Sequence, residues 1–232
     1  MATLAAARYD EVVRKVLFGL ELVDLLSGIP VTRGLELTAD GLGVPRRLSS
    51  SGFVWLLNGE PEARTVVVRI VSTDLRFRDR NATITVPAND GLAKPHLFRR
   101  KRLLWPTGLT LPPPGMTAVA GMLIDDNVPA GPVADAMIRI ELPDLGGGVL
   151  VGSYRALSDR RGGFVAAAPN FREAVPTSAP PPAPEGSVVG WLRIRSGGVT
   201  RYTPKLAMRP GRVLRLAEPL QLSTLSLAPP SP

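Results

Sequence analysis

Apolar and polar residues alternate along this chain in short runs that end at glycine, proline or aspartate. In the second half, the alternation predicts strands over Ala118 to Ile124, Ala136 to Leu142 and Tyr154 to Leu157, with a further strand from Phe164. Such alternation is typical of strands that bury one face. Strands this short, separated by turn residues, predict a β-sandwich.

The first half carries a similar order of strands and turns. Its runs are VLFGLELVD, VTRGLELTAD, FVWLL, TVVVRIVSTD and RNATITVP, read from Val16 to Pro87. The run from Thr65 to Asp74 is the richest in β-branched residues and predicts a central strand. In the last run, Ala82, Ile84 and Val86 are expected to share one face. The phrase LVD-x-x-SGIPV also matches LID-x-x-VPAGPV of the second half, which indicates two related sandwiches in tandem.

Composition agrees with an all-β chain. It has 23 glycines and 24 prolines in 232 residues, which favours many turns over long helices, and its 44% of apolar residues can fill two cores. The chain has no cysteine, which excludes disulfides and thiolate metal sites. The N-terminus carries no export signal pattern, and the apolar runs are too short to span a membrane. We therefore expect a cytoplasmic protein, or one in a particle assembled in the cytoplasm.

Three turns of the second half resemble those of a known family. They read G-x-L-x-D, P-V-x-D-A and S-D-x-x-G-x-F, and they are similar to the turns of the carboxypeptidase regulatory-like, transthyretin-like domain. The resemblance is clearest at about 117–195, and a more divergent copy lies at about 16–88. It implies two tandem transthyretin- or immunoglobulin-like β-sandwiches, usually non-catalytic modules. The motif residues are Gly121, Asp125, Pro132, Val133, Asp135, Ala136, Ser158, Asp159, Gly162 or Gly163, and Phe164.

These patterns divide the chain into five predicted segments. The sandwiches are expected at 16–90 and 116–217. A short arm or helix at 1–15 precedes them, a basic and proline-rich connector lies between them at 91–115, and an extended tail follows at 218–232.

The connector holds the strongest block of charge. The chain has 28 basic and 20 acidic residues, a net charge of +8, and Arg99, Arg100, Lys101 and Arg102 are consecutive. Arginines neutralise phosphates, so this basic patch is a candidate for binding nucleic acid or a membrane surface. The reading we favour is structural, with the arginines paired to carboxylates and the neighbouring leucines anchored on a core.

The C-terminal tail is apolar and carries no charge after Glu218. Its leucines, Leu220, Leu222, Leu225 and Leu227, are expected to be covered, either by their own domain or as an added strand on a neighbouring subunit. We therefore assign them as candidate partner-binding residues.

The sequence contains no recognisable catalytic, cofactor or metal motif. The single histidine, His96, has no neighbouring ligand at metal-binding spacing. Asp24 with Asp40, and the Asp125-Asp126-Asn127 run with Asp135, could be considered as calcium ligands, but turns favour these residues. Asp159 is expected to accept backbone N–H groups within its own turn.

The sequence therefore predicts a non-enzymatic structural or interaction protein without a cofactor. We expect its partners to be further copies of itself or other subunits of a bacterial assembly, such as a contractile-tail or phage-tail-like particle. One alternative is a carbohydrate or cell-surface binding module, which would need exposed aromatic residues, although Trp55 and Trp191 are expected to be buried in strands. The other alternative is polyanion binding through the basic patch.

Overall fold

A computed structural model describes residues 14–48, 52–58, 62–87, 99–126, 130–143, 149–151, 155–168 and 187–230. These residues form strands and loops, with one short 3-10 turn at Leu222–Thr224. The predicted all-β class is confirmed. Most of the predicted arm at 1–15 falls outside the described residues, which begin at Arg14, the first residue of β1. His96 and Asn127 also lie outside the described residues.

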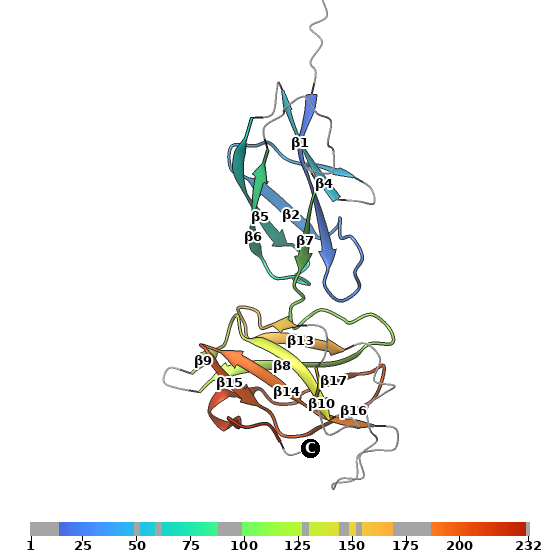
Figure 1. The fold of residues 1–232 in the computed structure, drawn as a ribbon, viewed down its shortest axis with the longest axis vertical. Helices are drawn as coiled ribbons and strands as arrows, with labels where there is room; N and C mark the ends of the chain where they lie inside the picture. The colour runs from blue at the N-terminus through green and yellow to red at the C-terminus, as the bar shows by residue number, and fades with distance from the viewer. Residues whose placement is uncertain are drawn as a thin grey trace, which may run out of the picture. The chain divides into compact units, whose positions relative to one another are not determined.

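The chain divides into two compact units, each made of three segments. Met1–Leu22, Pro30–Ile70 and Arg80–Arg102 form the first unit. Val23–Ile29, Val71–Asp79 and Leu103–Pro232 form the second. Figure 1 shows the strands of the first unit in blue to green and most of the second in green to red.

Among the described residues, seven strands build two sheets in the first unit. One sheet has the order β3 (Arg46–Leu48), β4 (Gly52–Asn58), β1 (Arg14–Asp24), β7 (Arg99–Leu104). The other has the order β2 (Leu35–Ala39), β5 (Arg64–Ser72), β6 (Arg80–Val86). The β-branched run is therefore the central strand of its sheet, as predicted.

The core of the first unit follows from strand alternation. On β6, Ala82, Ile84 and Val86 are buried and their neighbours are exposed, which confirms the predicted face. Trp55 is buried and stacks on Phe18, with ring centroids 4.7 Å apart. Burial of large side chains on one face of each sheet is the main stabilising contribution to such a fold.

The second unit contains a six-stranded and a five-stranded sheet. In the larger sheet, β10 (Met137–Pro143) and β14 (Val188–Ser196) are adjacent. β11 (Val149–Val151) and β12 (Ala156–Leu157) pair with β10, while β15 (Val199–Tyr202) and β16 (Leu206–Met208) pair with β14. In the smaller sheet, β8 (Thr117–Asp125) pairs with β9 (Gly131–Pro132), β13 (Gly163–Ala168), β17 (Val213–Arg215) and β18 (Leu220–Gln221).

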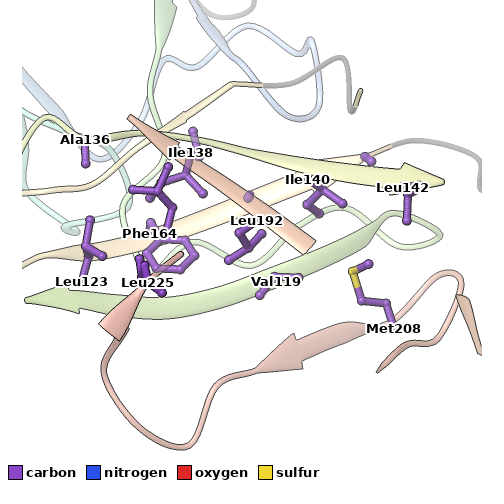
Figure 2. Packing of buried hydrophobic residues seen from close by; sticks show 14 of the residues in the cluster. Val119, Leu123, Ala136, Ile138, Ile140, Leu142, Phe164, Leu192, Met208 and Leu225 are labelled. Carbon is purple, nitrogen blue, oxygen red and sulfur yellow. The ribbon is translucent and has the colours of Figure 1, made fainter. Parts of the chain in front are cut away.

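The core of the second unit lies between these sheets. Figure 2 shows Val119, Leu123 and Phe164 from the smaller sheet packed toward Ile138 and Leu192 of the larger one. All five of these side chains are essentially inaccessible to solvent.

Strand β8 is buried on both faces over Thr117 to Ala120. Its alternate residues Ala118 and Ala120 point away from the core and pack with Val165, Ala167 and Leu26. The turn after β1 presents Leu26, because Asp24 accepts hydrogen bonds from the Leu26 N–H at 2.9 Å and the Ser27 hydroxyl at 2.8 Å. Asp24 thus has the turn role that the sequence favours over calcium binding.

The Asp-Arg-Arg-Gly-Gly turn joins β12 to β13 and approaches β8 closely. Gly162 has φ +77° and its carbonyl accepts the Leu123 N–H at 2.9 Å. A β-carbon at Gly162 would lie 2.2 Å from the Leu123 carbonyl oxygen. This position therefore needs glycine for both its backbone conformation and its packing.

The C-terminal tail docks on its own unit. β18, in the tail, pairs with β8 in parallel at Leu123 to Ile124, next to β17, which precedes the tail and pairs in parallel at Ala118 to Ala120. Leu225 is buried in the core, and Leu220 and Leu222 pack against it, whereas Leu227 is 69% exposed. Of the two placements considered for the tail, the structure has the one along its own domain.

The tail is also held by Asp126 at the end of β8. Its carboxylate accepts hydrogen bonds from the Ser223 hydroxyl and, at 3.2 Å, from the Ser223 N–H. These bonds lower the pKa of Asp126 below its usual value, the hydroxyl bond contributing most.

We predict that Gly162→Ala destabilises the chain more than Gly197→Ala. Gly197 also has positive φ, +55°, but nothing lies within 4 Å of an added β-carbon there. The left-handed conformation alone costs about 1–2 kcal/mol, and Gly162→Ala adds the clash with Leu123. Urea-induced unfolding of the full chain measures both. Equal losses for the two variants would contradict this account of the turn.

We also predict that Leu225→Ala lowers the unfolding free energy by about 2–4 kcal/mol, as expected for a buried leucine. Leu227→Ala is the matched control and should change stability by less than about 0.5 kcal/mol, because that side chain is exposed. The same unfolding experiment checks both. A negligible effect of Leu225→Ala would show that the tail does not pack in the core.

Candidate functional site

A cavity of about 590 Å³ opens in the second unit, on the face of β8 that points away from the core. All of its lining residues belong to this unit as defined above. They come from segments 75–79, 107–109, 120–122, 159–163 and 215–219. Its volume falls in the usual range for a ligand-binding pocket.

Backbone hydrogen bonds hold two of the walls together. The Arg78 N–H donates to the Trp105 carbonyl, and the Thr107 N–H donates to the Arg76 carbonyl, both at 2.9 Å. The Thr107 hydroxyl donates to the Leu75 carbonyl at 2.6 Å. Arg78 also forms an ion pair with Asp135, a residue of positive φ. Segment 75–79 is therefore fixed against segment 105–108.

Asp159 holds the third wall. One carboxylate oxygen accepts the N–H groups of Arg161 at 2.8 Å and Gly163 at 2.9 Å, and the other accepts the Gly108 N–H at 3.2 Å. The predicted role of Asp159 in its own turn is confirmed. The bond to Gly108, far away in sequence, is a further role that the sequence did not reveal.

The cavity combines apolar walls with basic residues at its rim. Leu75, Leu109 and Met122 are 52%, 63% and 43% exposed, although each is apolar. Arg160, Arg161 and Arg215 line the cavity and are exposed, and no described carboxylate forms an ion pair with them. Exposed apolar side chains next to unpaired cations are features of interaction surfaces.

The chemistry of the lining suits binding. Three carboxylates line the cavity: Asp159 is bound to backbone amides, Asp79 accepts the Ser72 N–H at 3.1 Å, and Glu218 is exposed. The Thr107 hydroxyl is engaged with a carbonyl rather than with a base. Within the described part of the chain, no group of three or more His, Cys, Asp or Glu residues is arranged to hold a metal ion.

The predicted basic patch lies on β7, and its arginines are engaged within the first unit. Arg99 pairs with Glu21 at 2.7 Å. Arg100 donates to the Thr85 carbonyl at 3.3 Å, and Arg102 to the Thr83 carbonyl at 3.0 Å. These bonds tie β7 to the edge of β6, in the other sheet. Lys101 is exposed. Binding of a polyanion or a partner by this patch, or by the tail leucines, stays a prediction.

The tryptophans bear on the carbohydrate alternative. Trp55 and Trp191 are 2% and 1% exposed, as expected from their strand positions, and Trp105 is half-buried. Aromatic stacking on a sugar needs an accessible ring face, so neither buried tryptophan can supply it in this structure. No helix in the described residues is long and apolar enough to cross a membrane.

Comparison of the chain with protein families, with curated proteins and with solved structures finds no match.

We predict graded losses of stability at Asp159. Asp159→Ala should lower the unfolding free energy by about 2 kcal/mol or more, because three backbone N–H groups lose their acceptor. Asp159→Asn should cost less, because it keeps one oxygen acceptor. Urea-induced unfolding of the full chain gives the order. An alanine variant as stable as the wild type would contradict the structural role of this carboxylate.

Proposed function

We propose that this chain is a non-enzymatic structural and interaction protein that binds another protein subunit through the cavity on β8. The partner segment is expected to be apolar, to fill the space beside Leu75, Leu109 and Met122, and acidic, to pair with the rim arginines. Such a protein fits a subunit or accessory of a multi-protein assembly, for which a contractile-tail or phage-tail-like particle is our leading candidate.

The observation that supports this proposal is the arrangement of carboxylates and arginines around the cavity. Asp159 and Asp79 are committed to backbone N–H groups, and Glu218 is the remaining carboxylate of the lining, whereas Arg160, Arg161 and Arg215 have no ion-pair partner among the described residues, so the rim carries more cations than free carboxylates. A complementary acidic surface would relieve this imbalance and would orient the partner. The exposed apolar residues beside the arginines would supply the buried contact area.

We also propose that the second unit is a transthyretin-like module of the carboxypeptidase regulatory-like kind. The motif residues support this by their roles. Asp159 and Gly162 build the turn before β13, and Phe164 lies near the start of that strand, in the core. Gly121 leaves room for the Phe164 ring, because a β-carbon on Gly121 would lie only 3.1 Å from it. Such modules commonly serve as non-catalytic parts of larger proteins.

Site-specific photocrosslinking tests the proposed partner site, because the chain has no native cysteine. Met122→Cys, labelled with a photoreactive maleimide, should crosslink a protein in extract from the source cells. Val199→Cys is the matched control, since Val199 is 45% exposed and does not line the cavity. Mass spectrometry of the adduct should identify a structural subunit of an assembly.

The charge at the rim provides a second arm of the test. Combining Met122→Cys with Arg160→Glu, Arg161→Glu and Arg215→Glu should strongly reduce the adduct if acidic residues of the partner pair with these arginines. Equal crosslinking from positions 122 and 199, or no protein adduct at position 122, would refute the proposed site.

A further inference from the structure

A row of arginines crosses the outer face of the six-stranded sheet in the second unit. In the β10–β14 register, Arg139 is directly opposite Arg193. Along the other edge of β10, Ile138 is paired with Ala156 of the antiparallel strand β12. The next residue along β10, Arg139, therefore lies beside the residue that precedes Ala156, which is Arg155. Figure 2 shows Ile138, Ile140 and Leu192 on the core side of these strands, and the arginines occupy the alternate positions. Side chains directly opposite each other on neighbouring strands have β-carbons about 5 Å apart.

The described residues on this face do not neutralise the row. Glu141 is the nearby carboxylate, and it is already engaged by the Trp191 indole N–H at 3.1 Å and by Arg193 at 3.4 Å. Arg139 and Arg155 form no ion pair with a described residue. Like charges on directly opposite positions of a sheet destabilise it, so this arrangement costs free energy unless an anion is bound.

Arg139 gives independent support for a missing partner. Its Nε atom is buried and makes no hydrogen bond. Burial lowers the pKa of the Arg139 guanidinium, and the charges of Arg155 and Arg193 lower it further, against an opposing effect of Glu141. A buried donor without an acceptor is costly, and an oxyanion at this position would supply both the acceptor and the negative charge.

The row is accessible to a ligand. Arg155 is exposed, and the Arg193 side chain is 43% exposed. Guanidinium groups are planar donors that bind phosphate in a bidentate manner. A tetrahedral oxyanion has several acceptor oxygens, so one group can accept hydrogen bonds from more than one arginine of the row.

We propose that Arg155, Arg139 and Arg193 form a binding site for a single phosphate or sulfate group, either as the free ion or as a monoester. This site is on the other sheet from the cavity and does not depend on the function proposed above. It is also distinct from the basic patch on β7, where the arginines already have partners.

Isothermal titration of the full chain tests the site. Inorganic phosphate and phenyl phosphate are the two probes, each titrated against a chloride blank of equal ionic strength. Saturable binding of one equivalent is expected for inorganic phosphate. Similar affinity for phenyl phosphate would indicate that monoesters also enter, and much weaker binding would assign the site to the free ion.

Two substitutions distinguish a built site from general attraction by a basic protein. Arg139→Gln should weaken phosphate binding at least tenfold. Arg209→Gln removes the same charge at an exposed turn position outside the row and should leave the affinity unchanged within twofold. Arg155→Gln, at an exposed position, should weaken binding with little effect on folding.

Thermal unfolding gives a readout that a purely structural arginine would not produce. Without phosphate, Arg139→Gln should melt no lower than the wild type, because it relieves like-charge repulsion. Phosphate should raise the melting temperature of the wild type and of Arg209→Gln, but much less that of Arg139→Gln. Absence of saturable binding, or equal weakening by Arg139→Gln and Arg209→Gln, would overturn the proposal. Binding of duplex DNA without any binding of the two small probes would also overturn it.

Discussion

The second unit depends on strand β8, which is paired along both edges and is buried on both faces over Thr117 to Ala120. Its backbone pairs with β13 and β9 along one edge, and with β17 and β18 along the other. One face contributes Val119 and Leu123 to the sandwich core, and the opposite face packs Ala118 and Ala120 against Leu26. An exposed edge or an uncovered apolar face on such a strand would invite association. The covering segments come from positions as distant as the turn after β1 and the C-terminal tail.

This enclosure explains why small residues recur along β8 and β13. Alanines on the outer face allow Leu26 to approach the sheet, and Gly121 leaves room for Phe164 and Leu216. The backbones at Gly108 and Gly163 also approach closely, and a β-carbon on Gly108 would lie only 2.9 Å from the Gly163 α-carbon. Because these two backbones are so close, the Asp159 carboxylate accepts the N–H groups of both Gly108 and Gly163. The cavity lies where this tight packing gives way to the longer side chains of Met122 and Arg215.

Two groups of arginines in this protein have different roles. On β7, Arg99 pairs with Glu21 of the neighbouring strand β1, and Arg100 and Arg102 donate to carbonyls of β6, so the last two join two sheets. Those at the cavity rim and in the row on β10 and β14 have few acidic partners among the described residues. Charge that the fold does not use is available for recognition, and both proposed sites use this second group.

The sequence by itself determined the local features of this protein. Alternation located β5, β6, β8 and β10 within a few residues, and the SDRRGG sequence predicted the turn around Asp159, because strand pattern and turn chemistry depend on neighbouring residues. Burial of Trp55 and Trp191 followed from their strands for the same reason. Only the tertiary structure decided the parallel pairing of the tail strand β18 with β8, the bond from Gly108 to Asp159, the walls of the cavity and the alignment of Arg155, Arg139 and Arg193. These features join residues far apart in the chain, and the alternation of a strand records which face is buried but not which strand becomes its neighbour.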